Sequence, residues 1–123
     1  MAVVTIDTRD KTPIYAQLER GLRAAMATSR LKPGDQLPTV RQLAVELRIN
    51  ANTVARVYAD LERAGAIETR RGVGSFVATS AENARPPEEH EKRLRAFVTR
   101  VLSDAGANGF SVDEVVKGLR EDT

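Results

Sequence analysis

The sequence predicts a mainly α-helical fold with one small β-hairpin, and three observations lead to this prediction. Residues 40–47 and 54–61 each repeat apolar residues at positions i, i+3, i+4 and i+7, which places them on one face of a helix. Only Arg48-Ile49-Asn50 separates the helix over residues 40–47 from the helix that carries the second repeat, which begins after Asn50. A basic turn over residues 70–74 then lies between two short strand-like runs. Two helices joined by a short turn and followed by a hairpin form a winged helix-turn-helix.

The N-terminal region predicts an extended segment and then a helix. Residues 3–6, Val-Val-Thr-Ile, are β-branched and form either a single edge strand or an extended arm. Thr12 is the expected N-cap of the helix and Pro13 its first residue. Gly21 interrupts the helix at a cost of about 1 kcal/mol relative to alanine, so tertiary packing must stabilise it. The helix ends near Thr28, and its apolar stripe comprises Ile14, Leu18, Leu22, Ala25 and Met26.

The next segment predicts a chain reversal and the two helices of the motif. Pro33 and Gly34 favour a tight turn within residues 31–35. Thr39 and Gln42 form a capping box for the helix over residues 40–47. Asn50 is a good N-cap for the third helix, and a glycine after Ala64 ends that helix. The buried residues expected from the two helices are Val40, Leu43, Ala44, Leu47, Val54, Val57, Tyr58 and Leu61.

The hairpin and the segment after it set the expected domain boundary. Strand candidates at residues 67–69 and 75–77 flank a turn with two arginines and two glycines, which predicts the wing. Residues 83–89 contain two prolines and scattered charge, and they read as a linker or as the lead-in to a further helix. We therefore expect a winged helix-turn-helix domain over residues 1–80 and a helical dimerisation tail over residues 81–123.

The tail predicts a helical hairpin with one apolar stripe on each helix. One helix runs from about Glu88 to Ala105, and a second capping box, Ser111 with Glu114, starts the next. The stripes either cover the winged-helix core of the same chain or pack against a second copy. A homodimer is favoured because two short helices bury more surface across a two-fold axis than alone. The expected dimerisation residues are Leu94, Phe97, Val98, Val101, Leu102, Val112, Val115, Val116 and Leu119.

The composition limits the classes of function. A chain of 123 residues, 41% hydrophobic and 29% charged, is an ordinary globular domain with a short appendage. The sequence has no apolar run near the ~20 residues that span a bilayer, no secretory signal and no cysteine, so we expect a cytoplasmic protein without a membrane partner. It offers no catalytic constellation, no metal-ligand spacing and no cofactor motif, so we expect neither an enzyme nor a bound cofactor.

The positive charge is concentrated in the half of the chain that carries the motif. Residues 1–80 hold 12 basic and 8 acidic side chains, whereas residues 81–123 hold 7 and 9. A basic helix-turn-helix unit is typical of proteins that bind double-stranded DNA.

Polar residues at the start of the third helix are the expected base readers, because this end of the helix faces the base edges in the major groove. Asn52 can pair with adenine, Thr53 can contact a thymine methyl group, and Arg56 can reach guanine or phosphate. Asn50 is as readily a cap alone as a DNA contact. Arg56 has the alternative of an ion pair with Asp60 on a solvated face.

Phosphate contacts are expected from the second helix and from the wing. Thr39 and Arg41 lie at the start of the second helix, which faces the DNA backbone in this motif. The hairpin tip offers two cations and two glycines that permit close backbone approach, and it suits the minor groove or its phosphates. The alternative for the tip is a flexible charged turn. The expected wing contacts are Arg70, Arg71, Gly72 and Gly74.

Residues 13–18, 37–44, 52–54 and 72–77 together closely resemble the GntR family of bacterial transcription regulators, over about residues 11–78. The short tail is similar to that of the YtrA subfamily, where it serves mainly in dimerisation. The resemblance implies a homodimeric regulator, usually a repressor and often of a neighbouring transporter operon, that joins the nucleoid when bound to its operator. It implies DNA contacts at Arg41, Asn50, Asn52, Thr53, Gly72 and Gly74, with Arg56 as a further one.

One residue departs from the family pattern, and two alternatives stay open. Many relatives carry Arg or Pro at the position of Ala51; if Arg reads a base there, this chain reads its operator differently. The leading hypothesis is a dimeric repressor with its recognition helices ~34 Å apart on a near-palindromic operator. In one alternative the winged helix is a protein-interaction module without sequence-specific DNA binding, and Arg41→Ala and Arg56→Ala leave function intact. In the other, a small effector binds at the dimer seam, although the sequence shows no recognisable pocket.

Overall fold

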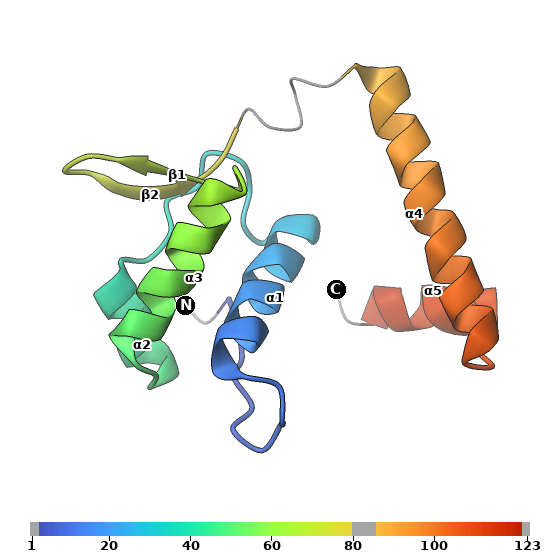
Figure 1. The fold of residues 1–123 in the computed structure, drawn as a ribbon, viewed down its shortest axis with the longest axis horizontal. Coiled ribbons are helices and arrows are strands. Elements are labelled where there is room, and N and C mark those ends of the chain that lie inside the picture. Colours follow the sequence, from blue (N-terminus) through green and yellow to red (C-terminus); the bar gives the residue numbers. More distant parts are fainter. Residues whose placement is uncertain (1–2, 80–85, 122–123) are drawn as a thin grey trace. The chain divides into compact units, whose positions relative to one another are not determined.

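The computed structural model describes residues 3–79 and 86–121 (Figure 1). These residues form five helices and one antiparallel two-stranded hairpin, so the mainly helical fold class is confirmed. The contacts divide the chain into two compact units, Met1–Ala81 and Glu82–Thr123. The elements are α1 (Ile14–Ala27), α2 (Val40–Leu47), α3 (Ala51–Arg63), β1 (Ile67–Arg70), β2 (Gly74–Val77), α4 (Pro87–Ala107) and α5 (Val112–Glu121).

Helix α3 is the centre of the first unit. It packs against α1, α2 and β1, and Figure 1 shows α1 running beside it. The four residues of its predicted stripe are all buried. Leu18 and Leu22 of α1 and Leu43 of α2 are fully buried in the same apolar cluster. The core therefore lies between the three helices, and the hairpin adds Ile67 and Val77 to it.

The N-terminal arm packs against α1 without forming a strand. Val3 and Val4 are both 5% exposed, so the extended-arm interpretation is confirmed and the edge strand is wrong. A Cβ atom on Gly21 would lie 2.5 Å from Cγ1 of Val4. Glycine inside this helix is therefore explained by the close approach of the arm.

The predicted N-cap of α1 is wrong. The helix begins at Ile14, and Pro13 stands at the cap position without a side-chain hydrogen bond. Thr12 belongs to the preceding loop, where its N–H donates to Oδ1 of Asp10 and its carbonyl accepts from Nε2 of Gln17, both at 2.8 Å. Because both backbone groups of Thr12 are engaged in the loop, the helix starts one residue later than predicted.

The predicted caps of α2 and α3 are confirmed. The N–H of Gln42 donates to Oγ1 of Thr39 at 3.1 Å, and the N–H of Thr39 donates to Oε1 of Gln42 at 2.9 Å. Oδ1 of Asn50 accepts from the N–H of Asn52 at 2.8 Å. Between the helices, Arg48 adopts the left-handed conformation with φ +58°, which reverses the chain within the short connection.

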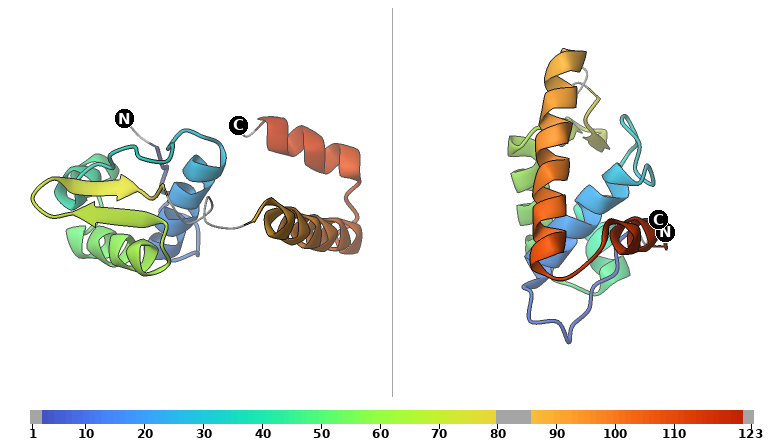
Figure 2. Two further views of the ribbon diagram at one scale, coloured as in Figure 1. Left: turned by 90° about the horizontal axis from the view of Figure 1, so that it is seen from above. Right: turned by 90° about the vertical axis from the view of Figure 1, so that its right-hand side faces the viewer.

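The hairpin pairs with a third segment that the sequence did not predict. Figure 2 shows β1 and β2 side by side, in antiparallel register. Residues 34–37, of which 34 and 35 were expected only as part of a turn, pair with the other edge of β2: the N–H of Gly34 donates to the carbonyl of Val77 at 2.9 Å, and that of Leu37 to the carbonyl of Ser75 at 2.8 Å. These bonds attach the wing to the segment that leads into α2.

The second unit consists of α4 and α5. Helix α4 begins at Pro87, and residues 83–85 of the expected lead-in lie outside the described residues. It ends at Ala107, two residues later than predicted. Gly106 therefore lies inside the helix, and the turn uses Gly109 with φ +79°.

The predicted capping box before α5 is confirmed. The N–H of Glu114 donates to Oγ of Ser111 at 3.2 Å, and the N–H of Ser111 donates to Oε1 of Glu114 at 3.0 Å. The hydrogen bonds from Ser111 lower the pKa of the Glu114 carboxyl. The start of α5 is thus fixed locally, as in α2.

Candidate nucleic-acid interface

The face of α3 opposite its buried stripe carries the predicted base readers. Asn52 and Arg56 are both exposed and lie four residues apart, so they share one face of the helix. Thr53 lies beside them and is half-buried. The side chain of Asn50 caps α3, which is the role that the sequence offered as the alternative to a DNA contact. The structure therefore brings Asn52, Thr53 and Arg56 together on one accessible surface.

Arg56 contacts an aromatic ring and not the carboxylate that the sequence offered as its alternative partner. Its Cζ atom lies 4.1 Å from the centroid of the Tyr15 ring on α1. Asp60 pairs with Arg63 on its own helix. The alternative of an Arg56–Asp60 ion pair is therefore wrong. Sequence analysis also did not identify Tyr15 as the residue that Arg56 contacts. The signal for it was an aromatic residue beside, but not on, the apolar stripe of α1.

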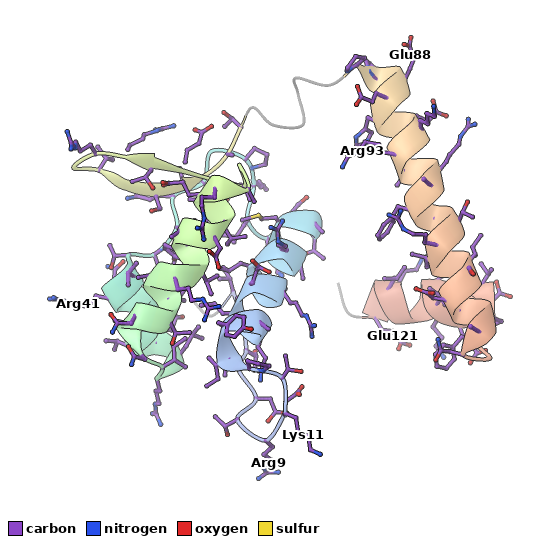
Figure 3. All side chains as sticks on the ribbon, in the orientation of Figure 1. Arg9, Lys11, Arg41, Glu88, Arg93 and Glu121 are labelled. Carbon is purple, nitrogen blue, oxygen red and sulfur yellow. The ribbon has the colours of Figure 1, made fainter. Side chains whose placement is uncertain are left out.

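The start of α2 presents a cation and backbone N–H groups to solvent. Thr39 and Arg41 are both exposed, and Figure 3 shows Arg41 pointing away from the unit. Oγ1 of Thr39 accepts the capping hydrogen bond, which leaves its hydroxyl hydrogen available to donate. A positive side chain beside a helix N-terminus is suited to a phosphate group.

Helix α3 is tied to the start of α2 by a side-chain hydrogen bond. The hydroxyl of Tyr58 donates to the carbonyl of Pro38 at 2.7 Å. Burial raises the pKa of this phenol to about 12, so the hydroxyl keeps its proton at neutral pH. Sequence analysis placed Tyr58 in the core but missed this bond, because its partner is a backbone carbonyl in another element.

The structure separates the two arginines of the wing. Arg71 lies in the exposed turn, whereas Arg70 is the last residue of β1, with Cζ 4.2 Å from the centroid of the Phe76 ring. In the antiparallel register Phe76 is the diagonal neighbour of Arg70, which brings a long side chain within reach of the ring. The expectation that both arginines occupy the tip is therefore wrong for Arg70.

The tip of the wing is braced by a residue that sequence reasoning missed. Nε2 of Gln36 donates to the carbonyl of Val73 at 3.2 Å. Gly72 and Gly74 have φ values of +77° and +142°, where other residues are strained. A Cβ atom on Gly74 would lie 2.8 Å from Nε2 of Gln36, whereas one on Gly72 would meet nothing within 4 Å. Gln36 thus occupies the space that only glycine at position 74 leaves.

The predicted dimerisation residues form a second exposed surface, along α4 and α5. Leu94, Phe97 and Leu102 are 52%, 55% and 47% exposed. Val101 and Val115 are half-buried, and Phe110, which was not predicted, is 56% exposed. Of the described residues of this unit, only Ala105 is buried. Its apolar stripes are therefore accessible on both helices.

Within residues 3–79 and 86–121, no group of His, Asp and Glu is placed to hold a metal ion. None of the helices in these ranges has the length and apolar character needed to cross a membrane. The same residues include no buried charged side chain. Their charged groups are accordingly exposed or half-buried.

The comparisons with known proteins agree with this arrangement of helices and hairpin. The profile of the bacterial regulatory proteins of the gntR family matches residues 14–77. The uncharacterized HTH-type transcriptional regulator YhcF of Bacillus subtilis is 34% identical over 108 residues, 88% of each chain. The HTH-type transcriptional repressor YtrA of Bacillus subtilis is 33% identical over 119 residues, 97% of this chain and 91% of that one. The structure of YtrA from Sulfolobus acidocaldarius, a GntR-family transcription factor, matches with a TM-score of 0.60 and 31% identity, covering 83% of this chain and 99% of that one.

Proposed function

This chain belongs to the GntR family of bacterial regulatory proteins, and from that premise we propose that it is a homodimeric repressor that binds a near-palindromic operator. It is a DNA-binding transcriptional regulator of the YtrA-like type and not an enzyme. The observation that carries the proposal is the face of α3, where Asn52 and Arg56 lie exposed opposite a fully buried stripe. Repression follows from the similarity to YtrA, which is a repressor by name.

In the proposed complex, α3 lies in the major groove with its N-terminal half against the bases. Asn52 pairs with adenine, Thr53 contacts a thymine methyl group or a base edge, and Arg56 donates to guanine. Asn50 contributes mainly by capping the helix: its side chain accepts from the N–H of Asn52, and its carbonyl accepts from the N–H of Thr53. Readout by Asn52 and Arg56 is supported by their shared face.

The backbone contacts come from α2 and the wing. Thr39 and Arg41 bind one phosphate group at the start of α2, and Arg71 follows the minor groove from the exposed turn. Gly72 and Gly74 let the backbone of the turn approach the DNA closely. Arg70 lies over Phe76, so its side chain supports the strand. It also presents a positive charge to the DNA from the side of the wing. The braced wing favours a defined contact over a flexible charged turn.

The winged helix-turn-helix occupies residues 1–80 in this proposal, and residues 81–123 form the dimerisation tail. The support is the exposed apolar surface of α4 and α5, which carries side chains about half exposed in the isolated chain. Burial of apolar surface stabilises such an interface by roughly 25 cal/mol for each Å² removed from water. In the proposed dimer this surface pairs with its copy across a two-fold axis, and the two recognition helices read half-sites about one DNA turn, ~34 Å, apart. A near-palindromic operator follows from that symmetry.

The biological setting follows from the YtrA-like resemblance. We propose that the regulated genes include a neighbouring transporter operon, that the protein works in the cytoplasm, and that it is nucleoid-associated while bound. Release by a small effector at the dimer seam belongs to the same proposal. It would appear as loss of DNA binding when the effector is added.

A mobility-shift assay on the gene's own upstream DNA tests the repressor proposal. The purified full chain is expected to retard that duplex at low salt and to protect two half-sites one helical turn apart. Affinity is expected to fall steeply between 50 and 200 mM salt, because phosphate contacts release counterions. Arg41→Ala should weaken binding to every duplex, whereas Asn52→Ala should relax preference at one base pair of each half-site.

Three outcomes would contradict the proposal. The first is no retardation at low salt by a chain shown to be folded. The second is equal affinity for operator and scrambled duplex. The third is a monomeric chain bound to a single half-site. The alternative of a protein-interaction module predicts that Arg41→Ala and Arg56→Ala change nothing, and the family match favours DNA binding over it.

A further inference from the structure

Arg56 is held by a contact that leaves its hydrogen-bond donors available. Its Cζ atom lies over the Tyr15 ring, 4.1 Å from the centroid. A cation over an aromatic face is attracted by the ring quadrupole, and the contact needs no hydrogen-bond acceptor. A carboxylate partner would engage the same N–H groups that recognise guanine or phosphate. The carboxylate one turn away, Asp60, is paired with Arg63.

The ring itself is anchored on a well-fixed helix. Tyr15 lies in the first turn of α1 and is 40% exposed, so one part of the ring is packed and the other is accessible. Two residues later, Gln17 accepts from the N–H of Asp7 at 2.9 Å and donates to the carbonyls of Asp7 and Thr12 at 3.0 and 2.8 Å. Leu18 and Leu22 bury the other face of the helix completely. Tyr15 is therefore a rigid support.

This support acts on a long side chain that has many rotamers. A free arginine loses much rotamer freedom when it is fixed at an interface. A side chain ordered before binding avoids part of that cost and also presents its donors in one direction. Direction matters for a guanidinium, since bidentate recognition of guanine depends on the orientation of its plane.

We propose that Tyr15 is a positioning residue for DNA readout, which holds Arg56 on the exposed face of α3 and so sets the base preference at the base pair that Arg56 faces. The inference rests on the proposed function, since it assumes that α3 reads bases. It makes α1, a helix of the supporting scaffold, a determinant of specificity. The competing explanation is that the stack only strengthens the packing of α1 against α3.

Binding by four variants of the full chain separates the two explanations. A duplex selected from a random pool by the wild-type chain, together with its single-base variants, is titrated by fluorescence anisotropy. Tyr15→Leu is expected to bind the selected duplex about three- to tenfold more weakly. It should also lose preference at the same base pair as Arg56→Ala. Tyr15→Phe keeps the ring and should keep the preference, and the double variant Tyr15→Leu/Arg56→Ala should bind like Arg56→Ala alone.

The double variant Asp60→Ala/Arg63→Ala is the matched control, because it removes an exposed arginine of α3 together with its own carboxylate partner and leaves no unpaired acid one turn from Arg56. It should leave the preference at that base pair unchanged. Thermal unfolding shows whether each variant is folded. If the melting temperature of Tyr15→Leu falls, Tyr15→Phe, which keeps the ring, provides the comparison.

The inference is overturned if Tyr15→Leu weakens binding to all duplexes by one factor, since that is the effect of packing alone. Tighter binding by Tyr15→Leu, or a loss that adds fully to that of Arg56→Ala, would overturn it too. Wild-type binding and preference in Tyr15→Leu would overturn the inference while the proposed function stands. A wild-type chain that selects no duplex would overturn both.

Discussion

The hydroxyl of Tyr58 lies 2.7 Å from the carbonyl oxygen of Pro38 and donates a hydrogen bond to it. The bond joins the middle of α3 to the residue before the capping box of α2. Two helices that are connected in sequence by Arg48-Ile49-Asn50 are thus connected a second time, at the end of α2 that faces the proposed DNA backbone.

Tyr58→Phe is expected to lower the free energy of unfolding by about 1 kcal/mol. The ring still fills the core, but the Pro38 carbonyl loses its donor. Urea unfolding monitored by circular dichroism measures the change, and the m value should not change because the exposed area is the same. An unchanged midpoint would mean that the hydrogen bond makes no net contribution.

The same phenol predicts a loss of stability in alkali. Its pKa is 10.0 in an unfolded chain and about 12 in the fold, where burial favours the neutral form. A raised pKa contributes stability that is fully present below pH 10 and is lost as the pH rises towards 12. The wild-type urea midpoint should therefore fall over this range more steeply than that of Tyr58→Phe. Parallel pH profiles for the two proteins would contradict the assignment.

Gly74→Ala should damage the wing more than Gly72→Ala. Both positions have positive φ, which costs an alanine roughly 1–2 kcal/mol, but only at position 74 does the new Cβ also meet Gln36. We expect Gly74→Ala to push the Gln36 side chain off the Val73 carbonyl and to weaken DNA binding by about fivefold, the equivalent of one lost hydrogen bond of about 1 kcal/mol. Gly72→Ala is the matched control for strain alone. Equal affinities of the two variants in a mobility shift would argue against the brace.

The contact between Val4 and Gly21 predicts strong coupling between the two positions. Gly21→Ala should destabilise the protein by about 1–3 kcal/mol, because its Cβ would overlap the valine side chain. In a Val4→Ala background the same change should cost much less, since space opens and alanine favours the helix by about 1 kcal/mol. Urea unfolding of the four proteins gives the coupling energy. A cost for Gly21→Ala that is the same in both backgrounds would disprove the contact.

Phe97→Glu should dissociate the proposed dimer. A carboxylate placed in the centre of an apolar interface leaves a buried charge without a partner, and we expect dimer affinity to fall by about 100-fold. Analytical ultracentrifugation measures the equilibrium directly. Ser103→Glu, on the opposite face of α4, adds the same charge outside the stripe and should leave the dimer intact. Dissociation by both variants would point to net charge and not to the stripe.

Sequence reasoning succeeded where structure is decided by neighbouring residues. The Thr39–Gln42 and Ser111–Glu114 capping boxes, the Asn50 cap and the buried stripe of α3 all follow from spacings of three or four residues. Such patterns carry their own geometry, because the helix repeat fixes which side chains meet. The order of the elements and the character of each face were therefore predictable.

The missed contacts arose mainly where distant segments meet. The pairing of residues 34–37 with β2, the approach of Val4 to Gly21 and the stack of Arg56 on Tyr15 each join residues that only the fold brings together. Arg70 was misplaced because its contact with Phe76 depends on the hairpin register. The elements were thus predicted correctly, whereas the contacts between distant residues that support them were not.

The pairing of residues 34–37 with β2 also determines how the sheet meets other molecules. It closes one edge of β2, so β1 is the edge strand in the part of the chain that the structure describes. This strand has only four residues, and three of them, Glu68, Thr69 and Arg70, are polar. A short, charged edge resists the addition of a foreign strand. In the proposed dimer, two wings can therefore lie close together on one operator without strand exchange or aggregation between them.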